Sequence, residues 1–155
     1  MDPVVIKRVL PCSKRQLFDA WSQPALLSRW LFASQQPTAK STVQSSFTVG
    51  GHYEVIMHLP TGDYRHYGVY RAIERYHHIA FSWNSHIVED SLVELHFREL
   101  SPNRCELTLT HSQFPSEEVR TKHNDGWQRC LQNLPLLWPA QNTLDITSDG
   151  SGSPN

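Results

Sequence analysis

The segment from Ser116 to Trp138 constrains the fold most, because it carries one wide apolar stripe. Apolar residues recur every three or four positions, the spacing of one face of an α-helix. The stripe consists of Val119, His123, Trp127, Cys130, Leu134 and Leu137. His123 is a polar group inside this face, one turn before a tryptophan. The pattern predicts a long helix that lies across a sheet, with a pocket beneath it.

The region before this helix alternates in steps of two, which predicts antiparallel strands with one buried face. Within each predicted strand the apolar residues share parity: Tyr53, Val55, Met57 and Leu59, then Ile79, Phe81 and Trp83, then Val93, Leu95 and Phe97, then Cys105, Leu107, Leu109 and His111. Gly50-Gly51 is predicted to join strands at 47–49 and 52–59 as a hairpin turn. Pro102-Asn103 is predicted to turn the last hairpin.

The strand around Gly68 has two possible registers. Regular alternation would send Arg71 inward with Val69 and Ile73. A bulge near Arg71-Ala72 would instead bury Tyr70 and Ile73. We favour the bulge, because burying an arginine without a partner is costly.

The N-terminal part predicts a strand at Val4 to Leu10 and two short helices. Ser13 and Gln16 form a capping box for the first helix, at 13–22, and Pro24 begins the second, at 24–31. Residues 35–46 are predicted to form a loop. Pro135 is expected to kink or end the last helix, which could break before Leu136. The sequence thus predicts one α+β domain over residues 1–140, in the order strand, two helices, about six strands and helix, followed by a disordered tail at 141–155.

Composition excludes several classes of function. The net charge is −1 and the 14 basic residues form no cluster, so we expect no nucleic-acid binding. Apolar runs fall short of the roughly 20 residues that span a bilayer, so no membrane insertion is expected. The N-terminus lacks an export signal, and the three cysteines have no paired spacing. These features predict a cytoplasmic protein with reduced thiols.

Several short features occur in a recognisable order: Pro24 and Trp30, Gly50-Gly51, Gly68, Phe81-Ser82-Trp83, Thr110-His111 and Gly126-Trp127. Together with the order of elements they resemble the START-like superfamily, over about residues 4–138. Within it the sequence is similar to the branch named after the C-terminal domain of the activator of Hsp90 ATPase. The resemblance implies a helix-grip fold, in which a curved antiparallel sheet of about seven strands wraps around the C-terminal helix and encloses a cavity. Members bind lipids, polyketides, plant hormones or other hydrophobic molecules, and a few are cyclases or hydrolases.

We therefore predict a site between the sheet and the last helix for a hydrophobic or aromatic small molecule. Its expected walls are inward strand residues and the helix tryptophan, with Trp30 closing one end and two histidines supplying polarity. The predicted lining is Trp30, Tyr53, Met57, Tyr70, Phe81, Trp83, Val93, Leu95, Phe97, Leu109, His111, His123 and Trp127.

Plainer interpretations stay open for three of these residues. Trp127 can be a core residue that only shapes the pocket, which we favour over direct ligand contact. His123 can be satisfied by a backbone carbonyl. His111 can cap the loop at 112–116, an interpretation slightly favoured over a place at the pocket mouth.

The nine histidines do not form a metal motif, because adjacent His77 and His78 point to opposite faces of a strand. His52 and His58 lie roughly 20 Å apart along an extended strand. No nucleophile or phosphate-binding motif occurs. We expect no metal, no cofactor and no assigned catalytic residue, and His111 or His123 with Tyr53 or Tyr70 are the only proton carriers suited to chemistry.

Three hypotheses follow. The first is binding of a hydrophobic or aromatic small molecule. The second is a cyclase- or hydrolase-like enzyme that uses a pocket histidine. The third and least favoured is an interaction with Hsp90, since the activator has an additional N-terminal domain for which these 155 residues leave no room.

Overall fold

The structure, a computed structural model, describes residues 1–32 and 41–139. In those residues the chain forms seven strands, three α-helices and one 3-10 turn. Their order is β1 (Val4–Leu10), α1 (Lys14–Ser22), α2 (Pro24–Trp30), β2 (Thr42–Ser45), β3 (His52–Leu59), β4 (Gly62–Glu74), β5 (His78–Trp83), β6 (Ser91–Ser101), β7 (Arg104–Ser112), α3 (Glu117–Asn133) and the 3-10 turn η1 (Leu134–Leu137).

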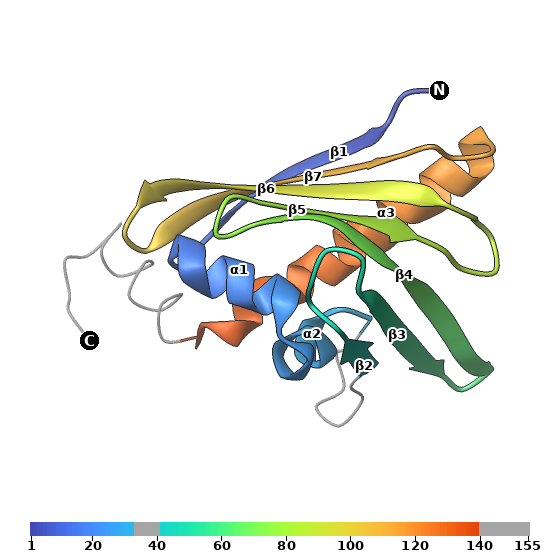
Figure 1. The fold of residues 1–155 in the computed structure, drawn as a ribbon, viewed down its shortest axis with the longest axis horizontal. Coiled ribbons are helices and arrows are strands. Elements are labelled where there is room, and N and C mark those ends of the chain that lie inside the picture. The colour runs from blue at the N-terminus through green and yellow to red at the C-terminus, as the bar shows by residue number, and fades with distance from the viewer. Residues whose placement is uncertain (33–40, 140–155) are drawn as a thin grey trace.

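The strands form one antiparallel sheet in the order β1-β7-β6-β5-β4-β3-β2. All three helices lie on one side of it, and the sheet curves so that its β2–β4 end turns around α3 (Figure 1). This is the predicted helix-grip arrangement, and both the α+β class and the order of elements are confirmed. The predicted tail at 141–155 lies outside the described residues.

A capping box and a proline fix the starts of the first two helices. Gln16 N donates to Ser13 Oγ at 3.1 Å, and Ser13 N donates to Gln16 Oε1 at 2.9 Å, which completes the predicted capping box. Pro24 occupies the first turn of α2, where its missing N–H has no helical partner to lose.

The segment before β3 corrects two predictions. Thr42–Ser45, expected within a loop, is strand β2 and pairs with β3, with Thr42 opposite Ile56. Residues 47–49 are not a strand, because Phe47 turns into the core against Phe18, with ring centroids 5.7 Å apart. The remaining prediction of the segment, a loop at 35–40, lies outside the described residues.

Strand β4 contains the favoured bulge. The pairing with β5 shifts between Tyr70 and Ala72, so Tyr70 is buried while Arg71 is exposed. Arg71 Nη2 lies 3.5 Å from Asp90 Oδ1 at the surface. The bulge thus leaves the Arg71 guanidinium hydrated, so the penalty for desolvating a charge is avoided.

Gly68 marks a close approach between β4 and β5. A Cβ at this position would lie 2.0 Å from the backbone oxygen of Ser82. Tyr53 is paired with Gly68 across β3 and β4, and its hydroxyl donates to the same Ser82 oxygen at 2.6 Å. Only glycine leaves room for both contacts.

Helix α3 ends close to where its proline predicts. Ser116 caps the start by accepting from Val119 N at 3.2 Å, and Glu117 and Glu118 occupy the first turn, where negative charge is favourable. The α-helix ends at Asn133, and Leu134–Leu137 continue as a 3-10 turn that contains Pro135. The predicted break before Leu136 is confirmed.

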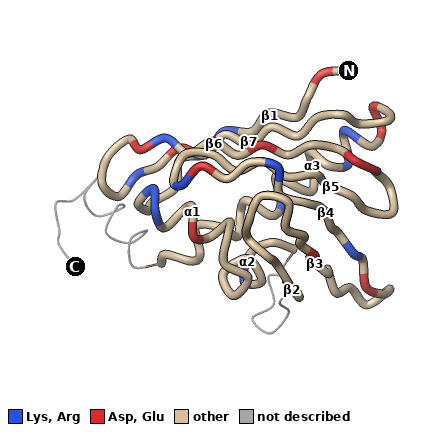
Figure 2. The backbone as a smooth tube through the Cα atoms, viewed as in Figure 1, with Lys and Arg blue, Asp and Glu red and all other residues tan. Residues whose placement is uncertain are grey.

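Acidic and basic residues are dispersed over the helices, strands and loops, and neither sign of charge gathers on one element (Figure 2). Within the described ranges no helix is both long and apolar enough to cross a bilayer.

Candidate functional site

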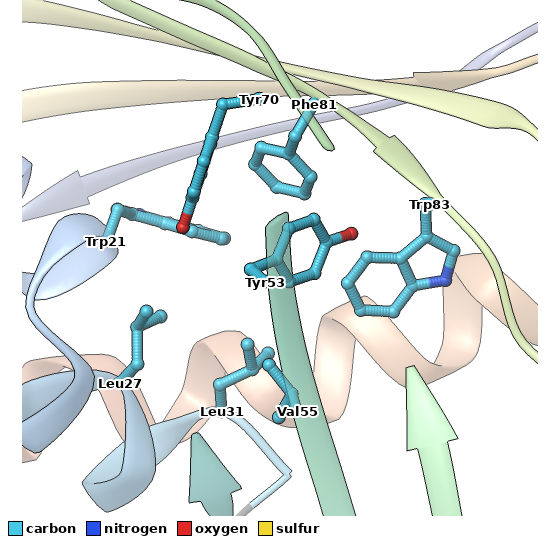
Figure 3. Close-up of a pocket in the computed structure, with 8 residues that line it drawn as sticks. All are labelled: Trp21, Leu27, Leu31, Tyr53, Val55, Tyr70, Phe81 and Trp83. Carbon is cyan, nitrogen blue, oxygen red and sulfur yellow. The ribbon is translucent and has the colours of Figure 1, made fainter. Parts of the chain in front are cut away.

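The interior between α1, α2 and the sheet is nearly filled by side chains. Eight residues surround a cavity of about 20 Å³, space for a single water molecule (Figure 3). They are Trp21, Leu27, Leu31, Tyr53, Val55, Tyr70, Phe81 and Trp83. This cavity is too small for an organic ligand.

Both phenols in this interior are engaged in hydrogen bonds. The Tyr53 hydroxyl donates to Ser82 O, and Tyr70 Oη lies 2.9 Å from Ser45 Oγ. Burial raises the pKa of both tyrosines, that of Tyr53 well above its ordinary value. The two residues therefore brace the sheet as neutral phenols and are poor proton donors for chemistry in the cavity.

A larger cleft lies between α3 and the β3–β4 hairpin. Its volume is about 490 Å³, within the roughly 300–1,000 Å³ of ligand pockets. It is lined by α3 residues, by β3 and β4, by Phe32 and by the loop after β5: Phe32, Met57, His58, Leu59, His66, Ser85, His86, Ile87, Lys122, His123, Gly126, Trp127, Arg129, Cys130, Gln132 and Asn133. This cleft lies between the sheet and the last helix, but only three of the thirteen predicted site residues line it.

His111 links Trp127 of α3 to Ser91 of β6 through hydrogen bonds. Trp127 Nε1 donates to His111 Nδ1 at 3.0 Å, so His111 carries its proton on Nε2, which donates to Ser91 Oγ at 2.8 Å. Ser91 Oγ in turn donates to the Trp83 carbonyl at 2.7 Å. Burial, and secondarily the charge of His123, lower the pKa of His111 well below its ordinary value. With both ring nitrogens bonded and no exposed surface, His111 is a neutral structural link.

His123 is arranged differently, because only one of its ring nitrogens has a hydrogen-bond partner in the part of the chain that the structure describes. Its Nδ1 donates to Val119 O at 2.8 Å, one helical turn back, which leaves Nε2 as an acceptor. The side chain is half-buried and lines the cleft. Burial lowers the pKa of His123, against the opposing effect of the Val119 hydrogen bond. The residue thus presents a neutral imidazole at neutral pH.

His66, a residue that the sequence analysis did not select, forms the opposite wall. Its ring stacks on Phe32, with centroids 4.1 Å apart, and lies 5.2 Å from Trp83. Its Nδ1 is buried and has no hydrogen-bond partner among the described residues. Burial is the main reason that the pKa of His66 is lowered to about 4. Backbone groups of Val55 and Tyr64 oppose this shift, and nearby His123 and His86 add to it.

The thirteen predicted site residues separate into three groups. Met57, His123 and Trp127 line the cleft. Tyr53, Tyr70, Phe81 and Trp83 surround the small cavity. The others lie buried in the core outside both linings: Trp30, Val93, Leu95, Phe97, Leu109 and His111. Trp30 is held there by its Nε1, which donates to Ala20 O at 2.9 Å.

Of the cleft residues absent from the sequence prediction, His66 carried a usable signal. Once the bulge at Arg71 is accepted, His66 shares inward parity with Gly68 and Tyr70, opposite Val55. Phe32 and His86 lie in loops, where no periodicity indicates direction. Among the described residues, no three His, Cys, Asp or Glu side chains are placed to share a metal ion.

The sequence matches the family described as activator of Hsp90 ATPase homolog 1-like protein over residues 11–137. The chain belongs to this family. A comparison with curated protein sequences finds no match. Several solved structures are similar to the fold described above.

Three similar structures illustrate this agreement. A Chromobacterium violaceum protein has a TM-score of 0.72 at 17% identity, over 88% of this chain and 96% of that chain. An AHSA1 protein from Silicibacter pomeroyi has a TM-score of 0.72 at 19% identity, over 90% and 99%. An Hsp90 activator from Plasmodium falciparum has a TM-score of 0.69 at 21% identity, over 88% and 96%. These likenesses show the helix-grip fold.

Proposed function

We propose that this family member binds a small molecule with an apolar or aromatic body in the cleft between α3 and the β3–β4 hairpin. The observation that carries the proposal is the cleft itself, about 490 Å³ of space at the junction of sheet and helix. Phe32, Met57 and Trp127 supply apolar surface, and polar side chains, His66 and His123 among them, supply hydrogen-bonding groups. That combination is typical of ligand sites.

Gly126 supports the proposal because it keeps the cleft open at the expense of the helix. A glycine inside a helix costs about 1 kcal/mol relative to alanine. A Cβ at Gly126 would meet no atom within 4 Å, so close packing does not explain the glycine. The residue lines the cleft, and any larger side chain would project into it. A site for a ligand accounts for both facts.

Filling the cleft tests the proposal. The probe is N-phenyl-1-naphthylamine, a neutral aromatic molecule whose fluorescence rises in apolar surroundings. We expect saturable binding to the wild type and at least tenfold weaker binding to Gly126→Leu, which places an isobutyl group in the cleft. Thr121→Leu adds the same group to an exposed position of α3 and should bind like the wild type.

The thermal midpoint separates loss of the site from loss of the fold. Gly126→Leu should melt at or above the wild-type temperature, since leucine is the better helix former. Wild-type affinity in a folded Gly126→Leu protein would refute the proposal, and so would the absence of any binding to the wild type.

Proton-transfer chemistry would fall to His123, because both nitrogens of His111 are already bonded. His123 lines the cleft, and its Nδ1–H bond to Val119 leaves Nε2 as the proton-accepting nitrogen that a general base requires. Replacing His123 with glutamine and measuring turnover of a bound compound separates an enzyme from a carrier. Undiminished turnover would exclude this histidine as the proton carrier.

An interaction with Hsp90 is the alternative suggested by the family and by the P. falciparum protein. It predicts that immobilised protein retains purified Hsp90 and raises its ATPase rate. Lack of both effects would remove the alternative and leave ligand binding as the function of the cleft.

A further inference from the structure

Resting on the proposed function, we propose that the ligand is an organic anion whose charged group is held by Lys122 and Arg129 while its apolar body fills the space over Gly126. The helix spacing places the two cations for this task. Lys122, Gly126 and Arg129 follow each other at steps of four and three, so they lie along one face of α3. All three line the cleft, with the open position between the two charged side chains.

The lining has charge of one sign. Among the described residues that line the cleft, Lys122 and Arg129 are the only lysine and arginine, and no aspartate or glutamate is present. The lining therefore contains no carboxylate. Elsewhere on the molecule acidic and basic residues are interspersed, and the whole chain has a formal net charge of −1 (Figure 2). The positive lining is therefore a local feature of the cleft.

The neighbouring acids neutralise this charge only in part. Glu118 Oε1 lies 3.4 Å from Lys122 Nζ on the exposed side of α3. Asp63 Oδ1 lies 2.8 Å from His58 Nδ1 at the β3–β4 end. Arg129 forms no ion pair within the part of the chain that the structure describes, so its guanidinium is available to a carboxylate, sulfonate or phosphate group.

The aromatic residues of the lining contact the apolar body of the proposed ligand. Trp127 lies one residue after Gly126, and Phe32 with the stacked His66 forms the facing wall. The lowered pKa values of His66 and His123 keep these rings uncharged at neutral pH, so they supply flat surface and single polar atoms. An amphipathic anion matches a cleft with a cationic rim and an aromatic wall.

The test compares two probes of similar shape, anilinonaphthalene sulfonate, an anion, and the neutral N-phenyl-1-naphthylamine. The variants are Lys122→Gln, Arg129→Gln and their combination. Each removed cation should weaken sulfonate binding about threefold, and the double variant about tenfold, because partly exposed charge pairs contribute modestly. Binding of the neutral probe should change less than twofold. Arg98→Gln removes an exposed arginine of β6 outside the cleft and should affect neither probe.

The outcomes distinguish this inference from the function on which it rests. If the neutral probe binds and the double variant leaves sulfonate binding unchanged, or weakens both probes equally, the anion preference is refuted while the binding site stands. If neither probe binds the folded wild type, the proposed function fails first. Displacement of the sulfonate by 1-naphthoate or by decanoate supports the inference and tells an aromatic acid from an aliphatic one. Displacement by neither overturns it.

Discussion

His66 should make the stability of this protein fall as the pH drops from 7 to 5. Its ring is 7% exposed, stacked on Phe32 and without a partner for Nδ1 in the described structure. Burial lowers its pKa from 6.5 to about 4. The unfolded chain therefore binds a proton at this histidine at a pH where the folded chain still excludes it. Stability is retained above the unfolded value and is lost as the pH falls through the window from 6.5 to about 4.

The magnitude follows from these two pKa values. A shift of this size lowers the free energy of unfolding by about 3 kcal/mol once the pH is below both pKa values. Between pH 7 and pH 5 the His66 contribution to the free energy of unfolding falls by about 2 kcal/mol. His111 and His123, whose pKa values are also lowered, add to the wild-type loss. A variant at position 66 isolates the share of His66.

The assay is urea unfolding followed by tryptophan fluorescence at pH 7 and pH 5. His66→Phe keeps an aromatic ring against Phe32 but cannot take up a proton. Its loss of stability between the two pH values should be about 2 kcal/mol smaller than the wild-type loss. His52→Gln removes an exposed histidine from neighbouring β3 and should keep the wild-type loss. Equal losses for His66→Phe and the wild type would refute the assignment of a buried, neutral His66.

Three further outcomes are expected. Gly68→Ala should lower the free energy of unfolding by at least about 2 kcal/mol in urea titrations, because the new Cβ would lie 2.0 Å from Ser82 O, and an unchanged midpoint would contradict the close approach. Trp127→Phe should cost about 1–3 kcal/mol by the same measurement, since it leaves His111 Nδ1 buried without its donor. Burial raises the pKa of Cys105, which lies outside the cleft, to about 11, so this thiol should react with Ellman's reagent at pH 8 only after unfolding, and rapid native labelling of Cys105 would be inconsistent with that burial.

Several elements followed from local chemistry and were predictable. The capping box of Ser13 and Gln16 fixes the start of α1, and the apolar parity of β5, β6 and β7 fixes which face they bury. The bulge at Arg71 followed from the cost of burying a guanidinium. Each of these outcomes depends on neighbours within a few residues in the sequence, or on a single transfer cost.

The exchange of strands before β3 was not predictable in this way. Phe47 has neighbours typical of a strand, but its ring packs against Phe18 and Tyr70, which are distant from it in sequence. Tertiary packing therefore draws 47–49 out of the sheet, and the polar Thr42–Ser45 takes the edge position. An edge strand can be polar because one of its sides faces solvent.

Sequence periodicity was enough to predict a helix with a histidine in its buried stripe and a sheet with one apolar face. It could not determine which inward side chains touch empty space, because parity reports direction and not the distance to the opposite wall. Tyr53 and Phe81 point inward as expected, yet they meet α1 and α2 and leave about 20 Å³ between them. The open volume lies instead between α3 and the β3–β4 hairpin, with Gly126 in its lining. Sheet curvature and helix placement arise from the packing of the whole domain, so the position of the cleft can be read only from the folded chain.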